Sequence, residues 1–182
     1  IIGPAIGWSI GLIGVSVLIT FLLGITVGAL LAWKSTPKLL RALLPLTMIG
    51  GVLPFYLMAM LLLYLLAFTT RIFPMTGAYD SGMPQVLSWQ YIGSIARHAV
   101  LPALSIILTS LGAWALTMRG LIVNTIGEDY MLLAEAKGLP KGRIMWWYAV
   151  RNAIPPQLAH LAIALGYVVS GAILVEIVFS YP

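Results

Sequence analysis

The chain has 182 residues, of which 61% are hydrophobic and only 8% carry a charge. Soluble domains are about one-quarter charged, and a water-soluble fold of this composition would expose large apolar patches and aggregate. Composition therefore excludes a soluble protein and predicts an integral membrane protein. The formal net charge of +5 is interpreted as a marker of cytoplasmic loops rather than of a nucleic-acid partner, since basic residues gather at the cytoplasmic ends of spans. The absence of cysteine excludes a disulfide framework and a thiolate metal site.

Apolar runs predict four membrane helices in a single all-α transmembrane domain covering 1–182. Residues 1–33 and 42–70 contain no charge, and both runs exceed the roughly 20 residues that span a bilayer. The expected spans are 6–32, 43–68, 100–118 and 158–179. A cleaved signal peptide does not explain the first run, because it lacks a basic start and is far longer than a signal core. Since the chain opens without Met and inside an apolar run, we expect an internal piece of a larger protein, with an element missing at each end.

The distribution of Lys and Arg predicts the orientation of these spans. Eight of the ten basic residues fall within 33–41 and 119–156, and the other two fall within 71–97. Cytoplasmic loops carry the excess of basic residues in membrane proteins. We therefore expect 33–41 to be a cytoplasmic turn, 119–156 a cytoplasmic loop and 71–97 an extracytoplasmic loop. Trp89 and Tyr91 are expected in a segment that lies on the membrane surface.

Small residues and prolines inside the spans predict how the helices pack. Small residues spaced by four let helix backbones approach closely in lipid, and two such pairs occur in the first span: Gly7 with Gly11, and Gly24 with Gly28. Three prolines remove backbone donors inside the apolar runs and are expected to kink the helices: Pro45, Pro54 and Pro102.

The loop 119–156 is predicted to contain two short helices joined by a rigid turn. Glu128 and Asp129 place carboxylates where they favour a helix N-terminus, and Gly138 is a natural stop for the helix that follows. Pro140 fixes the turn.

The second helix of the loop is expected to begin near Gly142 and to end at Pro155 and Pro156, before the last span. Both short helices carry apolar side chains that need a cover. Composition leaves two covers open, a protein partner and the lipid interface, and the second suits Met145, Trp146 and Trp147.

A set of residues in this loop resembles the signature of ABC-transporter permeases, most closely the peptide/nickel branch of the binding-protein-dependent importers. The residues are Ala134, Ala136, Lys137, Gly138, Leu139, Arg143, Ala149, Arg151, Asn152, Ala153 and Pro156. Segments elsewhere resemble the same branch, so that the resemblance covers nearly the whole chain: Arg71 to Gly77, His98 to Pro102, Glu128 to Tyr130, and Val175 to Pro182.

The resemblance implies a coupling helix that seats in a groove of a cytoplasmic ATPase. Its implied contact residues are Ala134, Glu135, Ala136, Lys137, Gly138 and Leu139. The implied partners are two cytoplasmic ATPase subunits that bind the ATP, a second homologous permease in a heterodimer, an extracytoplasmic solute-binding protein and membrane lipid. A prokaryotic inner membrane and a six-helix permease are implied, with the four spans as its second to fifth. The wider signature begins with Glu-Ala-Ala, whereas Leu132 and Leu133 stand at the first two positions here.

Enzymatic chemistry finds little support in the residues. The chain has no G-x-x-x-x-G-K-[ST] and no H-E-x-x-H motif, and we predict no catalytic residue, no metal site and no cofactor in this chain. Glu176 is the one acid inside a predicted span, and a place on the translocation path or a structural role would both explain it. Asp80 is interpreted as part of a solvated turn, Arg119 as an interface anchor and His160 as a hydrogen-bonded side chain.

The favoured function is an ATP-driven importer subunit that forms the translocation path for peptides or a related small solute. Two alternatives remain at this point. An ion- or proton-coupled secondary transporter would need buried acids or broken helices at mid-membrane. A membrane scaffold would dock a partner through the loop without transport.

Overall fold

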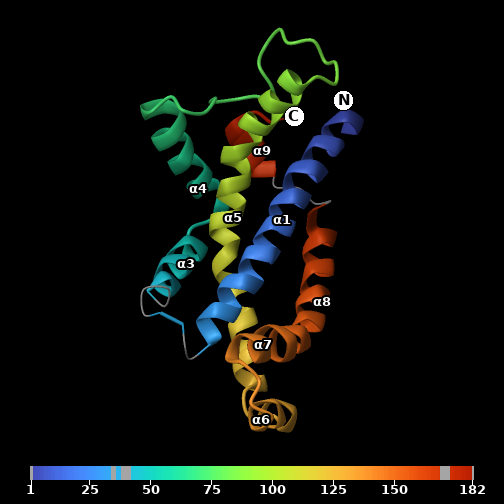
Figure 1. The fold of residues 1–182 in the computed structure, drawn as a ribbon. Helices are drawn as coiled ribbons and strands as arrows, with labels where there is room; N and C mark the ends of the chain where they lie inside the picture. Colours follow the sequence, from blue (N-terminus) through green and yellow to red (C-terminus); the bar gives the residue numbers. More distant parts are fainter. Residues whose placement is uncertain (1, 34–35, 38–41, 169–172, 182) are drawn as a thin grey trace.

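A computed structural model describes residues 2–33, 36–37, 42–168 and 173–181 of the chain. These residues form helices, turns and one longer irregular loop, without a β-strand among them, and the helices lie side by side in an elongated bundle (Figure 1). The all-α class predicted from the sequence is confirmed. Within this described part, 7–32 and 89–125 are the helical stretches long and apolar enough to cross a membrane. Most of the predicted turn 33–41 lies outside the described residues.

The bundle is built around two long helices, α1 (Ile2–Ala32) and α5 (Trp89–Thr125). At 1.5 Å of rise per residue they are about 45 and 55 Å long. α3 and α4 pack against α5 on one side, and α8 packs mainly against α1 on the other (Figure 1). Trp114 of α5 ties three helices together, because its ring meets Phe21 of α1 and His160 of α8 edge-on at centroid distances of 5.5 and 6.4 Å.

Two glycines of α1 explain why the central pair packs so closely. A Cβ atom added at Gly24 would overlap the Trp114 side chain, and one added at Gly28 would overlap the Ala115 carbonyl. Only glycine leaves room for the α5 backbone at these positions, which confirms the packing role predicted for this pair. The prediction is wrong for Gly7 and Gly11 within this chain, because no described atom comes within 4 Å of a Cβ added there.

The second predicted span is helical but interrupted. It comprises α3 (Leu43–Val52), α4 (Phe55–Leu62) and a π-helical stretch, η1 (Leu63–Thr69). The residue before a proline is driven out of the helical region, and Leu53 accordingly adopts ψ 130° before Pro54 at ψ 140°. The expected kink at Pro54 is therefore a complete break.

The other two prolines behave differently. Pro45 lies in the first turn of α3, where the amide donors have no helical partner and none is lost, so no kink arises from it. Pro102 lies inside α5, and the helix continues past it. The Ser105 hydroxyl donates a hydrogen bond to the Pro102 carbonyl at 2.7 Å, one turn further along the helix.

The helix α5 is longer than the predicted third span at both ends. It begins at Trp89, where the Ser88 hydroxyl caps it by accepting a hydrogen bond from the Tyr91 amide at 3.2 Å. Trp89 and Tyr91 therefore start this helix, and the last part of the segment 71–97, predicted to be a loop, is helical. At its other end, α5 runs on to Thr125, inside the predicted loop 119–156.

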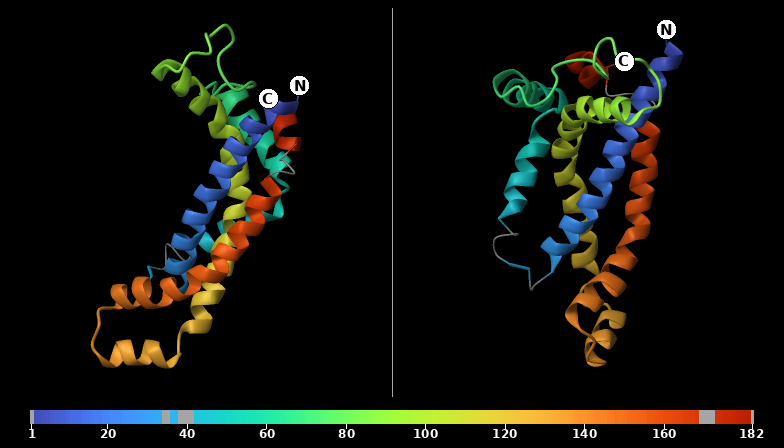
Figure 2. Two further views of the ribbon diagram at one scale, coloured as in Figure 1. Left: turned by 90° about the vertical axis from the view of Figure 1, so that its right-hand side faces the viewer. Right: turned by 45° about the horizontal axis from the view of Figure 1, so that its top comes forward.

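The loop 70–88 and both chain termini gather at one end of the bundle, which we call the outer end (Figures 1 and 2). The fourth predicted span is helical as α8 (Arg151–Val168) and α9 (Ile173–Phe179), and 169–172 between them lie outside the described residues. The Gly77 amide donates a hydrogen bond to the Phe179 carbonyl at 3.0 Å, which ties the loop to α9. The opposite end of the bundle carries α6 and α7, and we call it the α6 end.

Candidate partner-docking site

The helix α6 (Asp129–Ala136) begins immediately after a sharp turn at the end of α5. The chain leaves α5 through Ile126 in an extended conformation and Gly127 at φ +111°. Glu128 is the N-cap residue, and its carbonyl accepts hydrogen bonds from the Met131 amide at 2.9 Å and the Leu132 amide at 3.1 Å. Asp129 in the first turn interacts favourably with the positive end of the helix dipole. The predicted helix start is confirmed.

The other end of α6 is closed by a Schellman motif. The Gly138 amide bonds to the Glu135 carbonyl at 2.9 Å, and the Leu139 amide bonds to the Ala134 carbonyl at 3.3 Å. This motif requires a left-handed residue after the last helical one, and Gly138 supplies it at φ +71°. The prediction of a stop at Gly138 is confirmed, and the geometry gives the glycine a structural role in ending the helix.

Pro140 caps the next helical segment, which runs without a break into the bundle. It consists of α7 (Lys141–Ile144), the π-helical η2 (Met145–Val150) and then α8. The prediction that Pro155 and Pro156 end this segment is wrong, because both lie inside α8. Each proline removes only its own amide donor, and the segment accommodates this while it changes direction between α7 and α8 (Figure 2).

One face of α6 is buried in an apolar cluster that we call the loop core. Met131 and Ala134 are its members from α6, three residues apart on one helix face. The remaining members come from α1, α5 and the α7–α8 segment: Ala29, Met118, Ile122, Ile144, Ala149, Val150 and Ala153. The loop core therefore joins α6 to the ends of the two central helices, with the α7–α8 segment lying between them.

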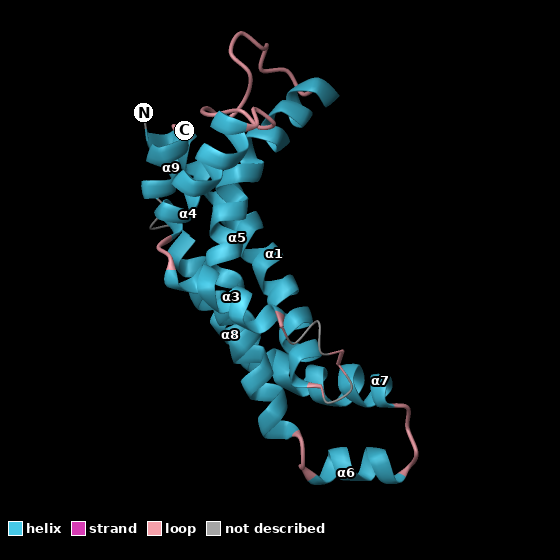
Figure 3. Ribbon diagram, turned by 90° about the vertical axis from the view of Figure 1, so that its left-hand side faces the viewer, coloured by secondary structure: helices cyan, strands magenta, loops and turns pink. Residues whose placement is uncertain are grey.

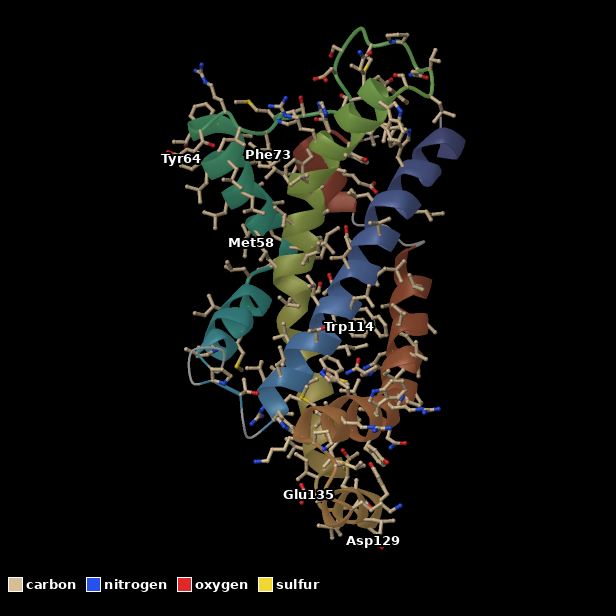
Figure 4. The ribbon with its side chains drawn as sticks, viewed as in Figure 1. Met58, Tyr64, Phe73, Trp114, Asp129 and Glu135 are labelled. Carbon is tan, nitrogen blue, oxygen red and sulfur yellow. The ribbon has the colours of Figure 1, made fainter. Side chains whose placement is uncertain are left out.

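The other face of α6 presents an apolar strip with charged neighbours. Leu132 and Leu133 are 53% and 56% exposed, and Ala136, one turn further on, is exposed beside them. Figure 4 marks Asp129 and Glu135 on this helix, at the end of the molecule farthest from both termini. Figure 3 shows α6 lying across the bundle axis at the tip of the molecule.

The six residues implied as contacts divide between these two faces. Glu135, Ala136, Lys137 and Gly138 are exposed. Ala134 is only 2% exposed in the loop core, and Leu139 is half-buried against the same cluster, so these two hold the helix in place. Sequence reasoning did not single out Leu132 and Leu133 as part of the exposed face, although their helical spacing to Ala136 puts all three on one side of the helix.

A hollow of about 280 Å³ lies beside α6 and extends the exposed strip toward the bundle. Trp33, Ile126 and Leu132 contribute to its lining, and Glu135 and Lys141 add one charge of each sign. Such a hollow suits an apolar side chain of a partner that is flanked by polar groups.

Asp80, which the sequence placed in a solvated turn, belongs to a polar network at the outer end. The Ser94 hydroxyl donates to the Asp80 carboxylate at 2.7 Å and accepts from the Asp80 amide at 2.9 Å. His98 lies buried with its Nε2 atom 4.0 Å from the same carboxylate, and its Nδ1 atom is 2.9 Å from the Ser94 carbonyl. The Arg97 guanidinium donates to the Ile72 carbonyl at 2.9 Å. These bonds fix the loop 70–88 on the start of α5.

The remaining predicted residues lie away from α6. Glu176 is half-buried on α9 at the outer end, and its Oε1 atom has no hydrogen-bond partner among the described residues. Arg119 is exposed on α5, and His160 is exposed on α8 against Trp114. Sequence reasoning did not single out Gln157, which is fully buried in α8 with neither amide atom bonded within the described chain.

Comparison with known proteins places the chain among transport proteins. A family model described as "Binding-protein-dependent transport system inner membrane component" matches residues 24–182. The chain is 30% identical over 174 residues to a probable peptide ABC transporter permease of Sinorhizobium fredii, with 96% of this chain and 53% of that protein covered. It is 28% identical over 176 residues to a dipeptide transport system permease of Escherichia coli, with 87% and 52% covered. A match of 40% over 86 residues to a probable D,D-dipeptide transport system permease of Escherichia coli covers 47% and 25%. The chain spans about half the length of the first two.

Proposed function

The chain belongs to the family of binding-protein-dependent transport system inner membrane components, and from this premise we propose that it is part of the permease subunit of an ATP-driven ABC importer. The fold is accordingly that of an all-α integral membrane permease. The subunit forms the translocation path together with a second, homologous permease. ATP hydrolysis is performed by two separate cytoplasmic subunits, and this chain binds no cofactor of its own.

One observation supports this proposal above the others, the two-faced character of α6. Its inner face is part of the loop core with α1 and α5, whereas Leu132, Leu133 and Ala136 on its outer face are exposed. A helix of this kind is suited to receive a push from a partner and to pass it to the membrane helices as a rigid-body movement. Glu135 and Lys137 beside the strip set its register by charge.

The orientation follows from the same assignment. The α6 end faces the cytoplasm of a prokaryotic cell, with 33–41 and 119–156 on that side of the inner membrane, in agreement with the excess of basic residues there. The loop 70–88 then faces outward and is available to an extracytoplasmic solute-binding protein.

The solute that we propose is a peptide. The relatives compared above carry names that refer to peptide or dipeptide transport. Glu176 stays a prediction for the translocation path, supported by a buried carboxylate oxygen that has no hydrogen-bond partner among the described residues.

The docking role of α6 is tested with the double variant Leu132→Asp/Leu133→Asp in the full-length protein. Burial of each leucine against a partner is worth about 1.5–3 kcal/mol, so we expect the ATPase subunits to be retained at least about tenfold more weakly. The pair Val86→Asp/Leu87→Asp is the control, since these adjacent apolar residues are even more exposed to solvent, at 64% and 89%, but lie on the outer loop. Both variants should insert and purify like the wild type. Undiminished ATPase retention by the α6 variant would contradict the docking role.

The two alternative functions make different predictions about energy coupling. Peptide uptake by the assembled complex in sealed vesicles should stop when ATP is withheld and should continue when a protonophore collapses the ion gradient. The opposite pattern would identify an ion-coupled transporter. Retention of the ATPase subunits without any solute uptake would identify a scaffold.

A further inference from the structure

A second hollow at the α6 end, of about 310 Å³, is lined by Arg143, Trp147, Tyr148 and Arg151. All four come from the continuous segment α7–η2–α8. Both arginines are exposed, Trp147 is 64% exposed and Tyr148 is half-buried. The spacing of four residues from Arg143 to Trp147 and from Trp147 to Arg151 places them along one side of the helix.

The positive charges of this hollow have no counter-charge within the chain. Among the described residues, neither Arg143 nor Arg151 has a carboxylate within 4.0 Å, and no acidic residue lines the hollow. The Trp147 indole and the Tyr148 hydroxyl donate no hydrogen bond within this part of the chain either. Two cationic residues and two residues with neutral donors therefore line one small hollow, with no acidic residue among them. Such a donor set fits an anion.

The loop core shows where the hollow lies along the bundle, because the segment that forms the hollow also contributes to this cluster. Ile144 and Val150 of this segment belong to the same apolar cluster as Ala29 of α1. Ala29 lies three residues before the end of α1 at Ala32, a distance of about 5 Å along the helix. The segment thus crosses the bundle where the apolar run of α1 ends, whereas α6 lies beyond it (Figures 2 and 3).

We propose that this hollow binds the phosphate headgroup of an anionic phospholipid from the leaflet at the α6 end. The forked donors of arginine match phosphate oxygens, and Trp and Tyr prefer the boundary between acyl chains and headgroups. The exposed Trp147 ring offers the first methylenes of the acyl chains an apolar wall, and its indole N–H reaches the polar layer. The inference rests on the membrane fold of the family and is independent of whether α6 docks an ATPase.

The test measures the lipids that stay bound to the full-length complex after extraction from membranes containing equal parts of phosphatidylglycerol and phosphatidylcholine. Native mass spectrometry should find phosphatidylglycerol retained in preference to phosphatidylcholine. The double variant Arg143→Gln/Arg151→Gln should weaken this retention by about fivefold for each arginine removed. Lys141→Gln is the matched control, because it removes the same charge from the same helical segment but lines the hollow beside α6. It should retain phosphatidylglycerol like the wild type.

Three results would overturn the proposal: unchanged phosphatidylglycerol in the double variant, an equal loss in Lys141→Gln, or displacement of the lipid by millimolar inorganic phosphate. The last would mark a site for free phosphate. Loss of the ATPase subunits with unchanged lipid would assign the surface to a protein partner. If the double variant does not assemble, Arg143→Gln and Arg151→Gln are measured singly, with about a fivefold loss expected from each.

Discussion

The two ends of α5 are joined to their neighbouring loops in contrasting ways. At the α6 end, the loop is held by an apolar cluster in which Met131 and Ala134 are buried, and its free face is apolar as well. At the outer end, the loop also packs into an apolar cluster, through Ala78. Directional polar bonds are added to this packing, between Asp80 and Ser94 and from Arg97 to the Ile72 carbonyl. Apolar packing tolerates small sliding movements, whereas a hydrogen bond fixes one geometry.

Under the docking role proposed for α6, the α6 end would move against its partner, whereas the polar bonds of the outer end hold a fixed shape. A substitution that disrupts the contacts at one end should therefore destabilise that end and leave the other unchanged.

The largest expected effect comes from Ala134→Asp. This change puts an unpaired charge into the loop core, which costs about 3–5 kcal/mol and should lower the midpoint of thermal unfolding. Ala136→Asp is the control on the exposed face of the same helix, with an expected change of about 0.5 kcal/mol or less. If both variants unfold at the same temperature, the loop core does not hold α6.

The next effect concerns the turn after α6. Gly138→Val forces a β-branched residue to φ +71°, at a cost of about 1–3 kcal/mol, whereas Asn tolerates this conformation and Gly138→Asn should cost less. Hydrogen exchange of the backbone amides at positions 138 and 139 would report the fraying of the Schellman motif. Equal protection in the two variants would show that the left-handed conformation is not required.

A smaller effect is expected from Ser94→Ala at the outer end. The change removes both hydrogen bonds with Asp80 and should loosen the loop 70–88 by about 1 kcal/mol. Faster hydrogen exchange should be confined to this loop, with no change in α6. Ser81→Ala in the same loop is the control, because Ser81 is exposed and makes no described hydrogen bond. Exchange that also rises in α6 would mean that the two ends are not independent.

The smallest effect is a pH dependence at the outer end. Burial raises the pKa of Tyr181, just past α9, above its usual value of 10.0, so the folded state favours the neutral phenol. Its contribution to stability is present below pH 10 and is lost as the pH rises through the higher pKa of the folded state. Above about pH 10, the midpoint of unfolding should fall less steeply with rising pH in Tyr181→Phe than in the wild type. Identical profiles would show that ionisation of Tyr181 does not contribute to the pH dependence of stability.

Local signals in the sequence were sufficient where one residue type decides the backbone. Gly138 ends α6 because only a residue that adopts a left-handed conformation closes a Schellman motif, and Glu128 starts the helix for equally local reasons. The family resemblance supplied the docking role that we propose for the loop. It did not reveal which face of α6 is free, since the assignment of Ala134 to the core depends on Ile144 and Ala149 folding back over it.

Contacts between distant segments could not be predicted. Asp80 and Ser94 are separated by 14 residues, and nothing local in either indicates that the loop returns to the start of α5. The glycine pairs make the same point, because Gly24 with Gly28 and Gly7 with Gly11 have identical spacing. Only the first pair faces another helix closely, and this depends on where α5 crosses α1.

The continuity of α5 has a consequence for energy transfer across the membrane. The same helix carries the Asp80 network near its first turn and the loop core near its last, and Pro102 does not interrupt it. By thermodynamic linkage, if a partner bound to α6 alters the affinity of the outer loop for its own ligand, that ligand alters the affinity of α6 for the partner by the same factor. Binding of a ligand at the outer loop and binding of a partner at α6 would then shift the same conformational equilibrium.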